Sequence, residues 1–186
     1  MNTFFEERVD QLVDSAKRVA DAFEKAGIPY QIIGGLATYI HVDTRSPIDA
    51  RLTRDVDVAV RRADLDRIRK AVEAFGFKYR HIAGVDMLVD AKDPKARSAI
   101  HLVFAAEKVR PEYLEPIPEI RAPFRSAQGL CIAPIADLVT MKLTSFRLKD
   151  QVHVQDLDGV GLITPEVEAV LSPELKARLA QVRASS

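Results

Sequence analysis

The sequence predicts a mixed α/β (α+β) fold, in which a small mixed β-sheet is flanked by helices and followed by further C-terminal helices. Apolar residues recur at helical spacing over residues 9–23 and again over 65–75. Between these segments, "RDVDVAV" (54–60) alternates strictly, with Val56, Val58 and Val60 on one face and Asp55 and Asp57 on the other, as a strand with one polar face does. A chain of 186 residues with 47% hydrophobic content supplies one good core and is too short for two large domains.

The first helical segment stops at Gly27 and Pro29. The next run, "YQIIGG", is a short strand that ends in glycines, and a helix is predicted to resume from Gly35 onward. The order is therefore strand, glycine turn, helix. After the helix over 65–75, which stops at Gly76, three further strands are predicted, and they are "FKYRHI" (77–82), "VDMLVDA" (85–91) and "SAIHLVFA" (98–105).

The remaining third of the chain is predicted to be mainly helical. Prolines make residues 111–123 an extended excursion, and "GLCIA" (129–133) is one more short strand. Helices are expected over 135–147, from residue 150 to Gly159 or Gly161, and from Ser172, which is a suitable N-cap before Pro173. We expect one domain, with a core over 1–133 and a helical portion over 134–186 packed on it.

The charges and the single cysteine limit the classes of partner. Lysine plus arginine and aspartate plus glutamate balance at 27 each, so no overall basic field indicates nucleic-acid or membrane binding. Cys131 is alone, which excludes an internal disulfide framework and favours a buried, inert thiol. No signal peptide and no stretch of eighteen apolar residues is present, so a cytoplasmic protein without a membrane partner is expected.

Asp55 and Asp57 are the first candidate site residues. Residues two apart on a strand lie roughly 6.6 Å apart on the same face, so both carboxylates project into one space and repel unless a cation lies between them. Mg²⁺ or Mn²⁺ suits such a pair, because hard divalent ions prefer carboxylate oxygens and Mg²⁺ usually binds substrate phosphates as well. The alternative is a sheet with one solvated face.

Gly34 and Gly35 are the second candidate. Glycine lets backbone amides approach an anion closely, and a helix that begins there points its N–H groups and its positive dipole end at that anion. Taken alone, a Gly-Gly pair usually marks an ordinary turn. Followed by the paired aspartates, it indicates a phosphate site next to a divalent metal, and hence a nucleoside triphosphate (NTP).

These residues carry a family resemblance. The apolar run with Gly34 and Gly35, followed by an Asp-x-Asp strand that Thr53 and Arg54 introduce, resembles the nucleotidyltransferase superfamily related to DNA polymerase β. The later segment "DLVTMKLTSFRLKDQVHVQDL" (137–157) is similar to the helical segment of its minimal, AbiEii-like branch, in which a lysine on one helix and an aspartate on the next face the nucleotide. The resemblance implies a nucleotidyltransferase fold.

The resemblance also implies roles for single residues. Asp55 and Asp57 would ligate the metal and act in catalysis, and Lys142 would contact the β or γ phosphate. The other residues implied to act are Gly34, Gly35, Thr53, Arg54 and Lys149 in nucleotide binding and Asp150 as the helical acid, with Asp156 or His153 as its alternatives. We also expect Lys142, Ser145 and Lys149 to form one helical row of donors.

Two departures from the family pattern stand out. Nineteen residues separate the glycine pair from Asp55, a longer gap than is usual for the superfamily. The family's third carboxylate comes from a later strand, and the corresponding run 98–105 offers His101 instead. A neutral imidazole can act as a base or a ligand near pH 7, so His101 is either a catalytic replacement or a structural histidine on the polar side of a strand.

Three classes of function follow. The first is a Mg²⁺-dependent enzyme that moves a nucleoside monophosphate from an NTP to a hydroxyl, on tRNA or a protein, as in AbiEii-like toxins of toxin-antitoxin pairs. The second is a nucleotide-binding pseudoenzyme that lacks the third acid, and the third is a module whose partner is an antitoxin protein. The sequence shows no zinc-ligand spacing, no nucleophile elbow, no P-loop and no GxGxxG motif.

Overall fold

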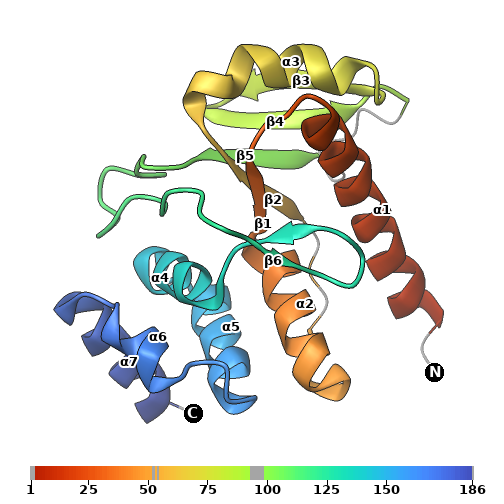
Figure 1. Ribbon diagram of the computed structural model, residues 1–186. Helices are drawn as coiled ribbons and strands as arrows, with labels where there is room; N and C mark the ends of the chain where they lie inside the picture. Colours follow the sequence, from red (N-terminus) through yellow and green to blue (C-terminus); the bar gives the residue numbers. More distant parts are fainter. Residues whose placement is uncertain (1–2, 52, 54, 93–98, 186) are drawn as a thin grey trace.

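The computed structural model of the chain describes residues 3–51, 53, 55–92 and 99–185 (Figure 1). The elements are α1 (Thr3–Lys25), β1 (Tyr30–Ile33), α2 (Gly34–Arg45), the 3₁₀ turn η1 (Pro47–Asp49), β2 (Val56–Val60), the 3₁₀ turn η2 (Arg62–Asp64), α3 (Leu65–Glu73), β3 (Phe77–Ile82), β4 (Val85–Asp90), β5 (Ile100–Phe104), β6 (Phe124–Arg125), β7 (Cys131–Ile132), α4 (Ile135–Ser145), α5 (Leu148–Gly159), α6 (Pro165–Ala169) and α7 (Pro173–Ala184). The predicted mixture of helices and strands is confirmed.

One mixed sheet organises the molecule. Within the described residues it has seven strands in the order β3-β4-β5-β2-β1-β7-β6. β2 runs antiparallel to β1 and parallel to β5, and the parallel register places Asp57 directly beside His101. The two segments that carry the candidate acidic and histidine residues are therefore neighbours at the centre of the sheet.

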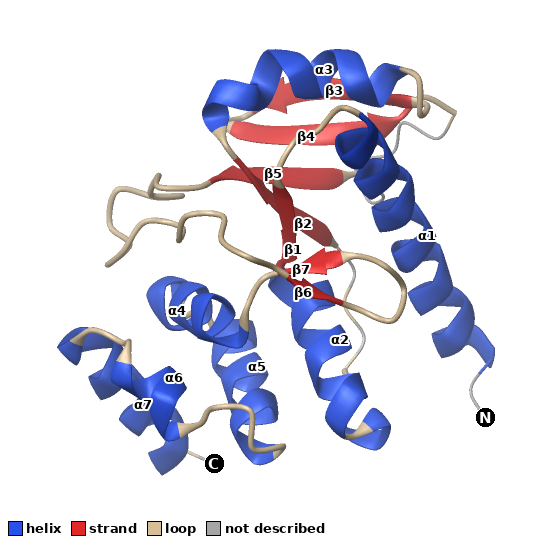
Figure 2. Cartoon of the chain, in the orientation of Figure 1, coloured by secondary structure: helices blue, strands red, loops and turns tan. Residues whose placement is uncertain are grey.

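Helices cover the sheet unevenly. α1 and α3 lie side by side against one face, whereas α2, α4 and α5 gather beyond the end of β1 (Figure 2). α6 and α7 pack on the outer side of α4 and α5. A single hydrophobic cluster runs from Leu12 on α1 through Val58 on β2 to Val182 on α7, so the C-terminal helices share a core with the sheet.

The helices after residue 134 differ from the prediction. α4 ends at Ser145 because Phe146 takes a left-handed backbone conformation with φ 52°, and α5 begins at Leu148, two residues before the expected start. Lys149 therefore lies on a different helix from Lys142 and Ser145, and the predicted row of three donors on one helix is wrong. The short elements α6 and β6 were not predicted.

Two further expectations can be compared with the structure, and a third stays untested. Cys131 is buried, as predicted for an inert thiol. None of the described helices combines the length and the apolar character needed to span a membrane. The division of the chain at residues 133 and 134 stays a prediction.

Candidate active site

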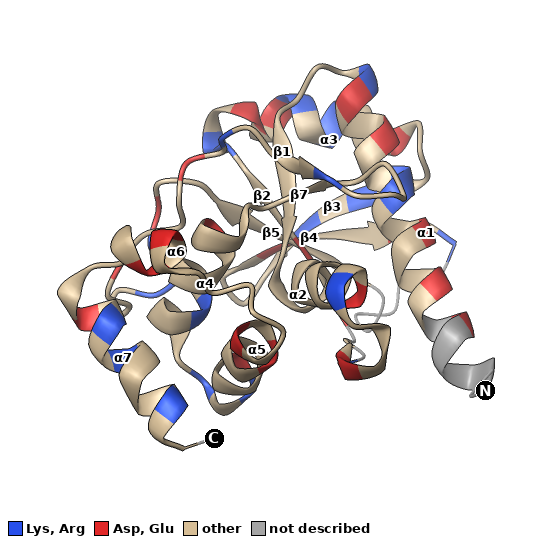
Figure 3. Ribbon diagram, turned by 60° about the horizontal axis from the view of Figure 1, so that its bottom comes forward, with Lys and Arg blue, Asp and Glu red and all other residues tan. Residues whose placement is uncertain are grey.

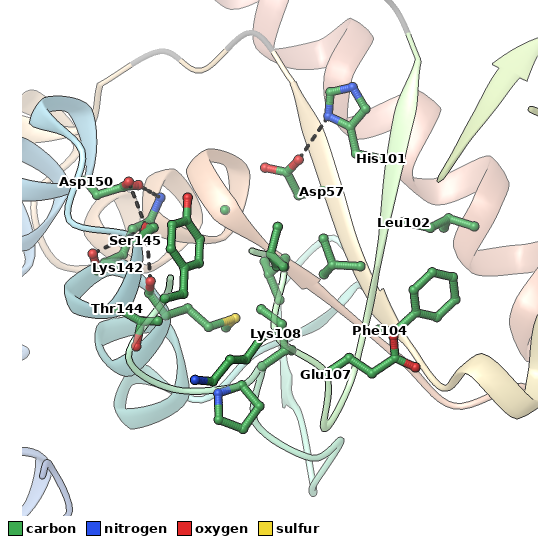
Figure 4. Close-up of a pocket in the computed structure, with 18 of the residues that line it drawn as sticks. Asp57, His101, Leu102, Phe104, Glu107, Lys108, Lys142, Thr144, Ser145 and Asp150 are labelled. Atoms are coloured by element: carbon green, nitrogen blue, oxygen red, sulfur yellow. Dashed lines mark hydrogen bonds and ion pairs between the residues drawn. The ribbon is translucent and has the colours of Figure 1, made fainter. Parts of the chain in front are cut away.

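The paired aspartates lie at the entrance of the central strand β2. Val56 and Val58 are buried in the core, so the alternation of the strand turns Asp57 to the other face, and Asp55 immediately precedes the strand. Both carboxylates border a cleft of about 440 Å³ between the sheet, the segment after β5 and the helices α4 and α5 (Figure 4). The structure thus places both predicted metal ligands in one cavity.

His101 lies next to Asp57 on the adjacent strand. Its Nδ1 is 3.1 Å from Asp57 Oδ1, and since an ionised carboxylate can only accept, Nδ1–H is the donor. The hydrogen bond with Asp57 raises the pKa of His101, against the opposing effect of burial, and the charges of Asp57 and Asp55 raise it further. His101 is therefore a stronger base than a free imidazole, and its Nε2 stays available to a ligand.

The glycine pair is required by close contacts. Gly34 has φ +68°, and a Cβ at this position would lie 2.1 Å from Asp57 Oδ2. A Cβ on Gly35 would lie 2.2 Å from Thr53 Oγ1. α2 begins at these glycines without a side-chain cap, so its first backbone N–H groups are available to an anion.

The structure brings only part of the predicted nucleotide-binding set to the cleft. Gly34 and Lys149 border it, whereas Gly35 and Thr53 are absent from its lining. Arg54 lies outside the described residues.

Lys142 is held in a buried polar cluster at the α4–α5 side of the cleft. Its side chain donates from Nζ to Asp150 Oδ1 at 3.3 Å and to His153 Nδ1 at 2.8 Å. Lys142 is 5% exposed and Asp150 is 0% exposed. Burial lowers the pKa of Lys142, and the charge of Asp150 offsets part of that effect.

Asp150 stabilises the corner between α4 and α5 through hydrogen bonds. It accepts hydrogen bonds from Ser145 Oγ at 2.8 Å and from Arg147 Nε at 2.6 Å. Burial alone would raise the pKa of Asp150, but the bonds from Arg147 and Ser145 and the charge of Lys142 outweigh it and lower the pKa. The corner therefore keeps an ionised carboxylate without any exposure to solvent.

The other candidates from the same segment differ in position. Lys149 is exposed at the cleft and has no ion pair with any described residue. Asp156 pairs with Arg51 at 2.9 Å and does not border the cleft. Of the two aspartates considered as the helical acid, only Asp150 lies at the cavity.

Sequence reasoning missed several residues of the cleft, among them Arg147 and Tyr113. Arg147 borders it beside Asp150, and its spacing of three residues from that aspartate was an available signal. Tyr113, on the proline-rich segment, borders the cleft, and no local pattern in the sequence indicated it.

Not all of the cavity belongs to the Asp57 side of the sheet. Leu102 and Phe104 also border it, but their side chains lie on the other side of β5 from Asp57 (Figure 4). The groups that face Asp57 across the cleft are those of α4 and α5, including Lys142 and Asp150 (Figure 4). The cleft therefore has Asp55 and Asp57 on the side of the sheet, and Lys142, Arg147 and Lys149 together with the buried Asp150 on the side of α4 and α5.

Comparison with known proteins identifies this architecture. No protein-family model and no curated protein sequence matches the chain. Among solved structures, it is similar to the solution structure of the antibiotic-resistance factor ANT(2″)-Ia, at 14% identity and a TM-score of 0.58, over 93% of each chain. It is also similar to an antigenic nucleotidyltransferase-like protein from Paracoccidioides brasiliensis, at 16% identity and a TM-score of 0.59, over 95% of this chain and 88% of that one.

A crystal structure of ANT(2″)-Ia in complex with adenylyl-2″-tobramycin also matches, at 12% identity and a TM-score of 0.54, over 93% of this chain and 97% of that one. The chain has a nucleotidyltransferase fold. The predicted fold class is thereby confirmed, and the AbiEii-like branch stays a prediction.

The possible metal ligands in this nucleotidyltransferase fold suit a hard divalent ion that takes only some of its ligands from the protein. Among the described residues, no three histidine, cysteine, aspartate or glutamate side chains gather as a closed metal site. Asp55 and Asp57 supply two carboxylates at the cleft, next to the uncapped start of α2. Mg²⁺ commonly takes one or two carboxylates and completes its shell with water and substrate phosphates, so the residues fit that ion.

The His153–Lys142 contact predicts a pH-dependent stability. Burial, together with the charge of Lys142, lowers the pKa of His153 to about 4 from an ordinary value of 6.5. Between these values the unfolded chain binds more protons, so the free energy of unfolding should fall as the pH decreases from 6.5 towards 4. Relative to His153→Gln, the wild type should lose roughly 2 kcal/mol over this window, as measured by urea denaturation.

The variant serves as the control for the other titrating groups. Burial lowers the pKa of His41 in the same direction, and the raised pKa of His101 acts with the opposite sign, but both contribute equally to the two proteins. Parallel curves of stability against pH for wild type and variant would show that His153 is not buried beside a charged Lys142.

Proposed function

We propose that this chain is a Mg²⁺-dependent nucleotidyltransferase that moves a nucleoside monophosphate from an NTP to a hydroxyl acceptor. The observation that carries the proposal is the cleft itself, in which Asp55 and Asp57 face Lys142 and Lys149. Opposite charges on the two walls suit a triphosphate with a bound cation, because the metal needs carboxylates and the phosphates need donors. The shared fold with ANT(2″)-Ia supports this reading.

The helix side and the sheet side of the cleft have different roles in the proposal. Lys149 and Arg147 supply positive charge to the β and γ phosphates, and the first amides of α2 donate to the same group. Lys142 contributes its charge from within the cluster of Asp150 and His153, which fixes its position. Asp55 and Asp57 would hold Mg²⁺, which when bound neutralises charge on the phosphates and polarises the reacting phosphoryl group.

In the transfer step, the acceptor hydroxyl oxygen bonds to the α-phosphorus while the bond from that phosphorus to the bridging oxygen breaks, and pyrophosphate leaves. The hydroxyl proton passes to His101 Nε2, because Nδ1 already carries the proton that it donates to Asp57. His101 thus takes the proton that a third carboxylate takes elsewhere in the superfamily. No covalent intermediate on the protein is involved.

The proposal also includes the type of enzyme, its acceptor and its partner protein. The resemblance of residues 32–60 and 134–163 to AbiEii-like proteins supports a toxin-type enzyme whose acceptor is tRNA or a protein and whose partner is an antitoxin protein. ANT(2″)-Ia was solved with adenylyl-2″-tobramycin, and that complex supports a nucleotidylated acceptor in general.

A second candidate function rests on His101. If His101, which occupies the place of the third carboxylate, does not accept the hydroxyl proton, that position supplies no base. The chain would then bind NTP without transferring it. In that case NTP with Mg²⁺ raises the melting temperature of the wild type, and no label is transferred.

The test of the proposed function is transfer of label from each of four α-³²P NTPs, with Mg²⁺ or Mn²⁺, to the protein itself and to total tRNA. Transfer is expected from at least one donor and should name donor and acceptor together. Absence of transfer from every donor, with a nucleotide-dependent rise in melting temperature, would establish the binding protein instead.

A further inference from the structure

The face of the sheet that carries Asp57 continues past His101 to the free edge of the sheet. In the strand register, Asp57 is beside His101, His101 beside Met87, and Met87 beside Arg80. β3 is the outermost strand on this side, three strands from β2. Because paired residues share a face and strands are about 4.8 Å apart, Arg80 lies roughly 14 Å from Asp57 along one row.

The opposite face of β3 lies under helices. Phe77 is 1% exposed and lies under the Arg18 guanidinium of α1, at 4.4 Å from the ring centre. Tyr79 lies under the Arg69 guanidinium of α3, at 4.3 Å. Since alternate side chains of a strand point to opposite faces, Lys78 and Arg80 lie on the face of Asp57.

Charges on the β3–β4 hairpin are separated by face. Its acidic residues belong to the helix-covered face, where Asp86 bonds to His81 at 3.0 Å and Asp90 pairs with Arg18 at 2.7 Å. Lys78 and Arg80 are exposed, and neither has an ion pair with a described residue. Basic residues on β3 are visible in Figure 3. The Asp57 face of the hairpin therefore has positive charge that the protein does not neutralise.

We propose that Lys78 and Arg80, here called the basic strip, bind the acceptor, and that this acceptor is a single-stranded nucleic acid. The inference rests on the proposed function. The terminal hydroxyl would reach Asp57 and His101, while phosphates one or two nucleotides upstream contact Lys78 and Arg80. Cationic side chains on phosphates position a nucleic acid without reading its sequence.

The geometry favours this acceptor over the alternatives. The reacting group and the cations lie roughly 14 Å apart along the row. This distance suits an extended chain with repeated anions, and it is longer than a compact small molecule. A protein acceptor presents no regular series of anions. The strip also reconciles nucleic-acid binding with the zero net charge of the chain, because the required field is local.

The test compares Lys78→Ala/Arg80→Ala with Lys25→Ala/Lys70→Ala, which removes the same charge from exposed positions on α1 and α3. Fluorescence anisotropy would measure affinity for a twelve-nucleotide RNA with a free 3′-hydroxyl, and for the DNA of the same sequence, at several salt concentrations. The strip variant should bind at least about tenfold more weakly, with the slope of log K against log salt reduced by roughly 1.4. The control variant should bind like the wild type.

Equal binding by the strip variant and the wild type would overturn the inference, as would a wild type that binds neither oligonucleotide. The proposed function is tested separately by label from α-³²P NTPs. Transfer to the protein itself without use of either oligonucleotide would refute the strip and leave the enzyme. Strip-dependent binding without any transfer would refute the enzyme, and would leave the strip as a nucleic-acid site without its role in binding an acceptor. An unchanged melting temperature of both variants, with and without NTP, checks folding and nucleotide binding.

Discussion

Replacing Asp57 with asparagine is expected to lower the rate of nucleotidyl transfer by at least about 1,000-fold, because a lost metal ligand removes several kcal/mol of stabilisation from the transferring phosphoryl group. Asparagine has nearly the same shape, and its amide oxygen can still accept from His101 Nδ1, so the sheet should be undisturbed. The measurement is the single-turnover rate of label transfer at saturating NTP.

Asp156→Asn is the matched control for this prediction. It makes the same chemical change on α5, at a carboxylate that pairs with Arg51 and does not border the cleft. Its rate should stay within about twofold of the wild type, since Asp156 does not border the cleft and its partner Arg51 is exposed. An Asp57→Asn protein that kept more than a tenth of the wild-type rate would remove Asp57 from the metal site.

The second large effect concerns stability. Asp150→Asn should lower the free energy of unfolding by about 3 kcal/mol, because it leaves the Lys142 ammonium buried without its counter-charge. It also weakens the bonds from Arg147 and Ser145 that hold the α4–α5 corner. Urea denaturation of the two proteins at pH 7 measures the difference.

A double-mutant cycle identifies the cause. Adding Lys142→Met to Asp150→Asn removes the unpaired charge, so the double variant should be more stable than the sum of the two single losses predicts. The coupling should amount to about 1–3 kcal/mol. Additive losses would mean that the cluster contributes through packing alone.

Sequence patterns predicted the structure best where the spacing of apolar residues and the types of the residues between them indicated the same element. Strict alternation over residues 54–60 predicted both the strand β2 and the common face of Asp55 and Asp57. The glycine pair predicted the turn into α2, although the contact that demands Gly34 is with Asp57, some twenty residues later, and no local pattern shows it. The apolar run over 98–105, interrupted by His101, predicted the strand that carries this histidine.

The parts that could not be predicted depend on long-range contacts. The left-handed Phe146 that ends α4 is stabilised by the surrounding structure and has no glycine to mark it, so helical period was wrongly extended through it. Tyr113 and Arg147 reach the cleft from different segments, and only the assembled fold shows this. α6 could have been predicted, since Thr164 before Pro165 is an ordinary helix start and its side chain does accept from Val167 N.

The parallel pairing of β2 with β5 also bears on how the chain folds. It joins Asp57 to His101 across 44 positions, and β1 joins β7 through Ile32 and Ile132. Parallel pairs between distant segments form slowly, because the loop entropy is lost before the contacts form. We therefore expect the aspartates, the histidine and the lysine cluster to come together late in folding, so that a partly synthesised chain has no assembled site.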